Sequence, residues 1–253
     1  MSARLESVGL RSVYKATPAT VGGVRCKPDR AMEPASITIH NTANPNADAL
    51  DHYNAQTKGH LGSMQMAVHY YVDDKGTIYQ CLRDKEQGWH AGDGRGPGNS
   101  TSIAIEVCEK TGSDQAKAEE HAAALTADLI IQRGISVDHV VPHKRWTGKN
   151  CPHLILPHWD AFMARVRYYV ALFEGKVPET DPGAIYRVQV GAYTVEANAV
   201  AQRDRLRDAG YSDAFIVHSG DWYKVQVGAF SVKANAERLR DELVGKGYEA
   251  IIV

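Results

Sequence analysis

The stretch VPHKRWTGKNCPHLIL, residues 141–156, gathers several polar and metal-binding side chains into one short segment. Pro142, Gly148 and Pro152 interrupt it, so we expect a loop rather than a regular helix or strand. Such a loop holds polar groups in fixed positions. Its candidate functional residues are His143, Lys149, Cys151 and His153.

A second polar cluster lies far upstream in SITIHNTA, residues 36–43. There His40 ends an apolar strand that we predict over Ser36–His40. Taken alone, His40 is more often a hydrogen-bonded structural histidine. Together, His40, His143 and Cys151 form a three-ligand set. Three protein ligands with one open position are typical of a catalytic zinc, whereas structural zinc usually takes four.

The composition is that of an ordinary globular protein of one large or two small domains. The chain has 253 residues, a net charge of -1 and a hydrophobic fraction of 43%. This charge gives no general attraction to nucleic acid or to anionic lipid. No apolar run is long enough for a membrane span, and residues 1–15 lack the apolar core of a signal peptide. We therefore expect synthesis in the cytoplasm. The four scattered cysteines favour isolated thiols over a disulfide framework.

Periodicity and breakers predict an α/β arrangement for the first 175 residues, with a mixed central sheet flanked by helices. Residues 1–36 are expected to be an irregular, extended lead-in. The further predicted elements are a helix over Ala47–Gly59, a hairpin over Ala67–Gln80, a strand over Ile103–Val107, a helix over Asp114–Arg133 capped by Ser113, and a helix that begins at Pro157.

Two features of the central region bear on a functional site. In SIAIEVC, residues 102–108, Glu106 lies between Ile105 and Val107. An acid in so apolar a strand either points out of the sheet or has a function. The run GDGRGPGNS, residues 92–100, is too rich in glycine for a core element and is expected to be a mobile loop near the site.

The C-terminal part contains an internal repeat. After a polar linker predicted over residues 176–183, YRVQVGAYTVEANA from Tyr186 is echoed by YKVQVGAFSVKANA from Tyr223, 37 residues later. Each copy predicts a strand, a helix (Val195–Ala209 and Val232–Lys246) and a second strand. The two copies predict a small α+β split βαβ domain over residues 184–253, with a four-stranded antiparallel sheet and both helices on one face.

Strand alternation places Gln189 and Gln226 on the open face of this sheet, where the first and third strands are central neighbours. A flat, polar, exposed surface suits sugar hydroxyls; the alternative is that both glutamines are merely solvated. RNA-binding sheets of similar topology carry stacking aromatics on these strands. Here the positions hold Arg187, Gln189, Lys224 and Gln226. RNA is therefore disfavoured as a ligand.

Five ordered segments carry a resemblance to a known family. They are TIHNTA, HYYVDDKGTIYQ, GWHAG, SIAIEVC and the stretch 141–156. In this order and spacing they resemble the zinc-dependent N-acetylmuramoyl-L-alanine amidases of phage endolysins and bacterial autolysins, relatives of the peptidoglycan recognition proteins. The resemblance covers roughly residues 20–175. The repeated C-terminal part resembles the sporulation-related repeat (SPOR) domain, which binds peptidoglycan glycan. The implied division is 1–175 amidase, 176–183 linker and 184–253 SPOR domain.

The resemblance implies that His40, His143 and Cys151 bind Zn²⁺, that Glu106 is the catalytic acid/base and that Lys149 assists. His153 is a rival third ligand. We prefer Cys151, because it fits the family pattern and because a lone cysteine between Asn150 and Pro152 has no apolar reason to be there. Trp89 and His90 are expected to line the groove for the stem peptide. Some relatives carry a catalytic tyrosine where Val68 stands here, which shifts that role to Glu106.

The implied reaction is hydrolysis of the amide between N-acetylmuramic acid and L-alanine. The C-terminal domain would hold the glycan strand and raise the local substrate concentration. The enzyme would act on the cell wall after its release, as an endolysin or as an autolysin. The competing hypothesis is a non-catalytic peptidoglycan-binding module of the same fold, although such modules typically lack the cysteine ligand. A general metallopeptidase is disfavoured, because the sequence contains no HExxH motif.

Overall fold

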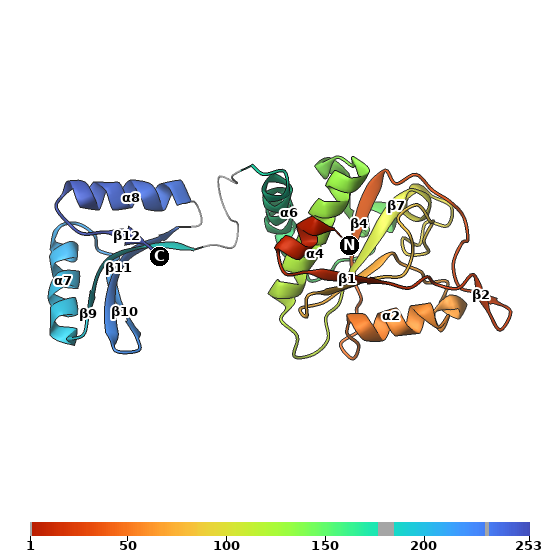
Figure 1. The fold of residues 1–253 in the computed structure, drawn as a ribbon, viewed down its shortest axis with the longest axis horizontal. Helices are drawn as coiled ribbons and strands as arrows, with labels where there is room; N and C mark the ends of the chain where they lie inside the picture. The colour runs from red at the N-terminus through yellow and green to blue at the C-terminus, as the bar shows by residue number, and fades with distance from the viewer. Residues whose placement is uncertain (1, 177–184, 231–232) are drawn as a thin grey trace. The chain divides into compact units, whose positions relative to one another are not determined.

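The computed structural model describes residues 2–176, 185–230 and 233–253, and it divides the chain into two compact units, Met1–Lys176 and Val177–Val253 (Figure 1). Apart from Lys176, the predicted linker over residues 176–183 lies outside the described residues. Among the described helices, none is both long enough and apolar enough to cross a membrane. Each unit has its own buried core and is described by itself.

The N-terminal unit is built on a mixed six-stranded sheet, as predicted. In spatial order its strands are β1 (Arg11–Tyr14), β6 (Thr77–Gln80), β5 (Tyr70–Val72), β7 (Ser102–Val107), β4 (Ser36–Asn41) and β8 (Val140–Pro142). β5 and β6 form the predicted antiparallel hairpin, and every other pair of neighbours in this sheet is parallel. The carboxyl ends of β7, β4 and β8 therefore lie together at one edge of the sheet.

Helices cover both faces of this sheet (Figure 1). On one face α1 (Ala3–Ser7), α4 (Gln115–Arg133) and α6 (Trp159–Phe173) share a core with the strands. On the other face α2 (Ala49–Thr57) packs on β5 and β6. Strand alternation turns Ile37 and Ile39 of β4 towards the first core and leaves Thr38 and His40 on the opposite side. His40 is thereby held by a central strand that pairs with β7 along its whole length.

The helix caps differ from the sequence prediction in one detail. The N-cap of α4 is Asp114, whose carboxylate accepts a hydrogen bond from the Lys117 N–H at 3.1 Å, and not Ser113. The Ser113 hydroxyl instead donates to the Lys110 carbonyl at 2.7 Å. Both residue types cap helices well, so sequence alone did not decide between adjacent candidates. The helix ends at Gly134, as predicted, with the left-handed φ of 65° that favours glycine.

The prediction that residues 1–36 are irregular was wrong. The segment forms α1, the edge strand β1 and a small hairpin of β2 (Thr20–Val21) and β3 (Val24–Arg25). β1 is exposed along most of its length and pairs only with β6, so it lacks the alternating apolar pattern that reveals a strand in a sequence. Ser2 and Arg4 both donate to the buried Asp128 of α4, which fixes the start of the chain.

Short helical turns complete this unit. They are η1 (Gly62–Met64), α3 (Pro97–Ser100), η2 (Val137–His139), α5 (Lys144–Thr147) and η3 (Leu156–His158). α3 lies inside the glycine-rich run that we expected to be a loop. Its amides are held by Asp93, whose carboxylate accepts from the Gly98 N–H at 2.7 Å and from the Asn99 N–H at 3.2 Å. The run therefore has a defined internal hydrogen-bond pattern.

The C-terminal unit has the predicted topology. Its antiparallel sheet has the order β10 (Phe215–Ser219), β11 (Trp222–Phe230), β9 (Tyr186–Tyr193) and β12 (Ile251–Ile252). The helices α7 (Glu196–Asp208) and α8 (Lys233–Gly245) contribute Leu206 and Leu243 to a core with the valines of β9 and β11. Residue 232, the predicted start of the second helix, lies outside the described residues.

Candidate active site

Three chemically active side chains project from the same edge of the six-stranded sheet. His40 lies at the carboxyl end of β4, Glu106 occupies the register position opposite it on β7, and His143 directly follows β8 on the other side. The carboxyl edge of parallel strands is where α/β sheets usually bind ligands. The strand order alone thus brings together residues that lie up to about a hundred positions apart in the chain.

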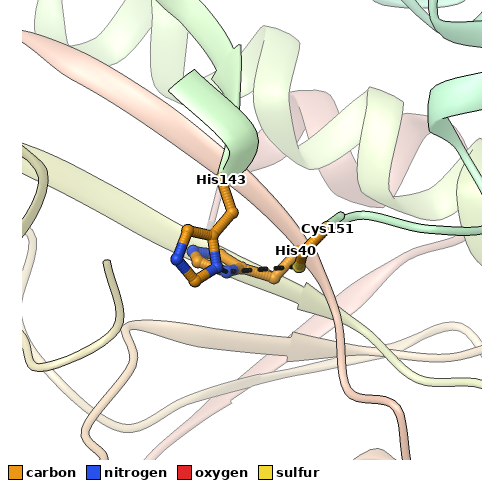
Figure 2. Close-up of side chains that lie close together, drawn as sticks. All are labelled: His40, His143 and Cys151. Carbon is orange, nitrogen blue, oxygen red and sulfur yellow. Dashed lines mark hydrogen bonds between the residues drawn. The ribbon is translucent and has the colours of Figure 1, made fainter. Parts of the chain in front are cut away.

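Cys151 reaches this edge through the loop predicted from its proline and glycine breakers. The loop turns at Gly148, which ends α5 with a φ of 76°, and the Lys144 N–H donates to the Cys151 carbonyl at 2.9 Å. Figure 2 shows the side chains of Cys151, His40 and His143 pointing toward one another. Their ligand atoms all lie within 4.8 Å of one another. The rival ligand His153 is not in this group and faces Glu109 at 3.6 Å.

The tautomer of His40 follows from its hydrogen-bond partners. His90 Nε2 lies 3.3 Å from the Ser102 carbonyl, which only accepts, so this nitrogen carries the proton. A neutral His90 then accepts at Nδ1 from His40 Nε2–H, 3.1 Å away. His40 is left with a lone pair on Nδ1. Partners of this kind are what usually orient a metal-binding histidine.

The same reasoning applies to His143. Its Nε2 donates to the Ala91 carbonyl at 2.9 Å, which leaves a lone pair on Nδ1. The Nδ1 atoms of His143 and His40 lie 3.0 Å apart, and Cys151 Sγ lies 3.8 Å from His40 Nδ1. Two lone pairs facing at this distance repel each other unless a cation binds between them. Two imidazoles and a thiolate are a ligand set that suits zinc, so these residues fit a metal ion.

Burial keeps both imidazoles in the neutral, metal-binding form. Burial lowers the pKa of His143 and, more strongly, the pKa of His40. Electrostatic repulsion from the neighbouring His90 and His143 lowers the pKa of His40 further. Burial also raises the pKa of the Cys151 thiol to about 11. A thiol in this environment ionises when a cation is bound beside it.

Glu106 is the acidic group of the site. Its side chain is buried, and its Oε2 atom has no hydrogen-bond partner among the described residues. Burial raises the pKa of Glu106 to about 7, although the positive charge of Lys149 acts in the opposite direction. A carboxyl group with a pKa near neutrality can both take up and release a proton under physiological conditions.

These groups share one cleft of about 580 Å³. Besides the three ligand residues, Glu106, Lys149, Trp89 and His90 line it, so every residue that we predicted for the amidase site reaches the same cavity. Sequence reasoning missed Asn99, whose Oδ1 accepts from the backbone N–H groups of His90 and Ala91 at 2.8 and 2.9 Å. No motif marked it, because it lies within a run that resembles a simple loop.

Comparison with known proteins is consistent with this geometry. The sequence profile described as N-acetylmuramoyl-L-alanine amidase matches residues 30–154, and that of the SPOR domain matches residues 182–253. The solved catalytic domain of XlyA is 42% identical, with a TM-score of 0.56 over 61% of this chain and 98% of that one. The chain belongs to the N-acetylmuramoyl-L-alanine amidase family.

Curated relatives of this chain include XlyA and CwlH of Bacillus subtilis (strain 168). XlyA is 44% identical over 146 residues, or 57% of this chain and 48% of XlyA. CwlH is 44% identical over 140 residues, or 54% of each chain. The chain thus spans about half the length of the curated relatives that it matches.

The SPOR domain of this chain carries the predicted glutamine pair. Gln189 and Gln226 are register partners on the central strands, as expected. The expectation that both are exposed was wrong for Gln226, which is only 6% exposed. One row of register partners crosses the sheet from Phe215 through Gln226 and Gln189 to Ile251, so apolar side chains flank the two amides. Gln226 Oε1 is left buried and without a partner among the described residues.

Proposed function

We propose that this protein is an N-acetylmuramoyl-L-alanine amidase that hydrolyses the bond between the lactyl group of N-acetylmuramic acid and L-alanine of the stem peptide. One observation carries the proposal. The Nδ1 lone pairs of His40 and His143 face each other beside the Cys151 thiol. The same cleft holds Glu106, whose Oε2 atom has no partner within the described part of the chain. His40, His143 and Cys151 would hold Zn²⁺ as the cofactor.

The bound zinc ion would polarise the scissile carbonyl and lower the pKa of water towards about 7. Glu106 takes the proton from the attacking water and delivers it to the leaving amine of L-alanine. Lys149 supplies a positive charge near the tetrahedral oxyanion, an effect commonly worth about 3 kcal/mol. Trp89 lies in the wall of the cleft, where its ring would contact the stem peptide. His90 lines the same wall and orients His40 through its ring.

The SPOR domain is proposed to bind the glycan strand through the row that contains Gln189 and Gln226. The Gln226 oxygen has no partner among the residues that the structure describes. This oxygen and the amide of Gln189 would accept from and donate to sugar hydroxyls, while Phe215 and Ile251 offer apolar surface. Attachment to the wall would raise the local concentration of substrate around the catalytic domain. The protein would therefore act on the bacterial cell wall.

The test uses the full chain and a suspension of purified walls. We expect one zinc ion per chain by elemental analysis and a steady fall in turbidity. Complete removal of zinc by a chelator should stop the clearing, and added zinc should restore it. The variant C151S should keep its fold but bind zinc more weakly. Clearing that persists in protein stripped of zinc would contradict the proposal.

A further inference from the structure

A second cavity opens beside the active-site cleft. It has a volume of about 230 Å³ and shares Trp89, Gly94 and Asn99 with the wall of the cleft. Arg25, Pro28, Arg30, Gln87, Gly88 and Arg95 complete its lining. The cleft and this cavity therefore adjoin each other at Trp89, Gly94 and Asn99.

The cavity is positively charged. Arg25, Arg30 and Arg95 contribute to its wall, and no carboxylate of the described residues does. Within the described part of the chain, none of the three guanidinium groups forms an ion pair. Two arginines elsewhere in the unit are neutralised by buried carboxylates. Arg4 binds Asp128 at 2.7 Å, and Arg133 binds Asp84 at 2.6 Å.

The backbone around the cavity is held by hydrogen bonds. The Arg30 carbonyl accepts from the Gln87 N–H at 2.9 Å, and the Gly94 carbonyl accepts from Asn99 Nδ2 at 3.0 Å. Gly88 has no room for a side chain, because an added Cβ would lie 2.8 Å from the Ala67 carbonyl oxygen. The segments that carry the arginines are thus fixed against the wall of the active site.

We propose that this cavity, named here the arginine subsite, binds a free carboxylate of the peptide that leaves in the amidase reaction. The inference rests on the proposed function. Guanidinium groups match carboxylates in charge and in geometry, and the cavity has room for one such group. The lactyl carboxyl of muramic acid is itself part of the scissile amide, so the free carboxylates of the substrate lie on its peptide side. The arginine subsite therefore favours acidic stem peptides over amidated ones.

The experiment compares two soluble N-acetylmuramoyl peptides with the full-length protein. One carries free carboxylates beyond L-alanine, and the other carries carboxamides at the same positions. For the acidic peptide, R30Q and R95Q should each raise KM about three- to tenfold, because each variant removes one solvent-exposed charged hydrogen bond. Both variants should leave kcat within about twofold of the wild type. For the amidated peptide, both variants should match the wild type. R167Q, which changes an exposed arginine of α6, is the control.

Other outcomes would overturn the assignment. Equal losses on both peptides, or unchanged KM values on the acidic one, would show that the arginines do not recognise a carboxylate. In a third outcome, poly(glycerol phosphate) inhibits hydrolysis by the wild type more strongly than the acidic peptide does, and loses this inhibition in R30Q. That result would assign the arginine subsite to a phosphate polymer instead. If the wild type turns over neither peptide, the proposed function fails. Binding of the two peptides to E106Q, measured by tryptophan fluorescence, then still shows whether the arginine subsite prefers a carboxylate to a carboxamide.

Discussion

Glu106 lies directly opposite His40 in the register of the parallel strands β7 and β4. A rigid ladder thus sets the placement of the acid relative to a metal ligand, and no flexible loop intervenes. Both side chains are buried, and the carboxylate has an oxygen without a partner among the described residues. Metal binding and proton transfer are thus assigned to different residues, so a substitution of Glu106 can change one without the other.

E106Q should retain zinc and lose turnover. The amide has the shape of the carboxyl group but cannot accept a proton from water, so kcat should fall about 10²- to 10⁴-fold. Zinc content by elemental analysis and release of soluble wall fragments are the two measurements. E33Q, at an exposed glutamate paired with Lys85, is the matched control. Turnover at the wild-type rate in E106Q would remove Glu106 from the reaction.

His90 should control zinc affinity through its contact with His40. H90A removes the acceptor that keeps the proton on His40 Nε2, so the zinc dissociation constant should rise about 10- to 100-fold. H90Q can still accept and donate and should recover part of this loss. Competition with a chromogenic chelator measures the constant, and the exposed His60 provides the control H60A. An unchanged constant in H90A would show that His40 needs no such support.

Much of this site could be predicted because its residues lie at the ends of strongly apolar strands or between breakers. His40 and Glu106 lie near the carboxyl ends of buried strands, and Cys151 precedes a proline in a loop. The roles of Asn99 and of His90 towards His40 could not be predicted, because they depend on distances between segments that no spacing rule relates. Local patterns identify strands, whereas contacts between loops require the folded chain.

The errors in the fold have similar causes. β1 pairs on one side only and is exposed, so its sequence carries little apolar alternation. Gln226 was expected at the surface because strand alternation places it on the open face of the sheet. Gln226 is only 6% exposed, and its register partner on the neighbouring strand is the bulky Phe215. In both cases the identity of the neighbouring strand, rather than the residue itself, decided the outcome.

D48N should reduce stability only above acidic pH. Burial opposes ionisation of Asp48, but hydrogen bonds from Lys75, from the Asp51 N–H and from Lys110 outweigh it and hold the pKa of Asp48 well below its usual range. A depressed pKa stabilises the fold above the unfolded pKa of about 4, and the contribution is lost as pH falls through the folded pKa.

Because asparagine caps helices as well as aspartate, the variant isolates the charge of Asp48 at the start of α2. At pH 7 the free energy of unfolding should fall by about 1 kcal/mol, since both lysines are solvated, and the difference should shrink below pH 4. Urea unfolding at several pH values measures it, with D138N as a control at an exposed aspartate. A difference that does not vary with pH would contradict the electrostatic explanation.

Q226A should weaken attachment of the protein to the wall without affecting hydrolysis of soluble substrate. The alanine removes the buried amide at the centre of the proposed glycan row and should reduce retention about threefold to tenfold, the loss of one to two hydrogen bonds. Co-sedimentation of full-length protein with purified walls, in the E106Q background, measures retention. Q202A on α7 is the control. Undiminished retention would mean that glycan binds elsewhere.

Mass spectrometry of digested peptidoglycan shows which bond this cleft cuts. We predict fragments with a new lactyl carboxylate on muramic acid and a new free amine on L-alanine, and their absence after digestion with E106Q. New reducing sugar ends, or cleavage within the peptide with the junction of sugar and peptide intact, would contradict this prediction.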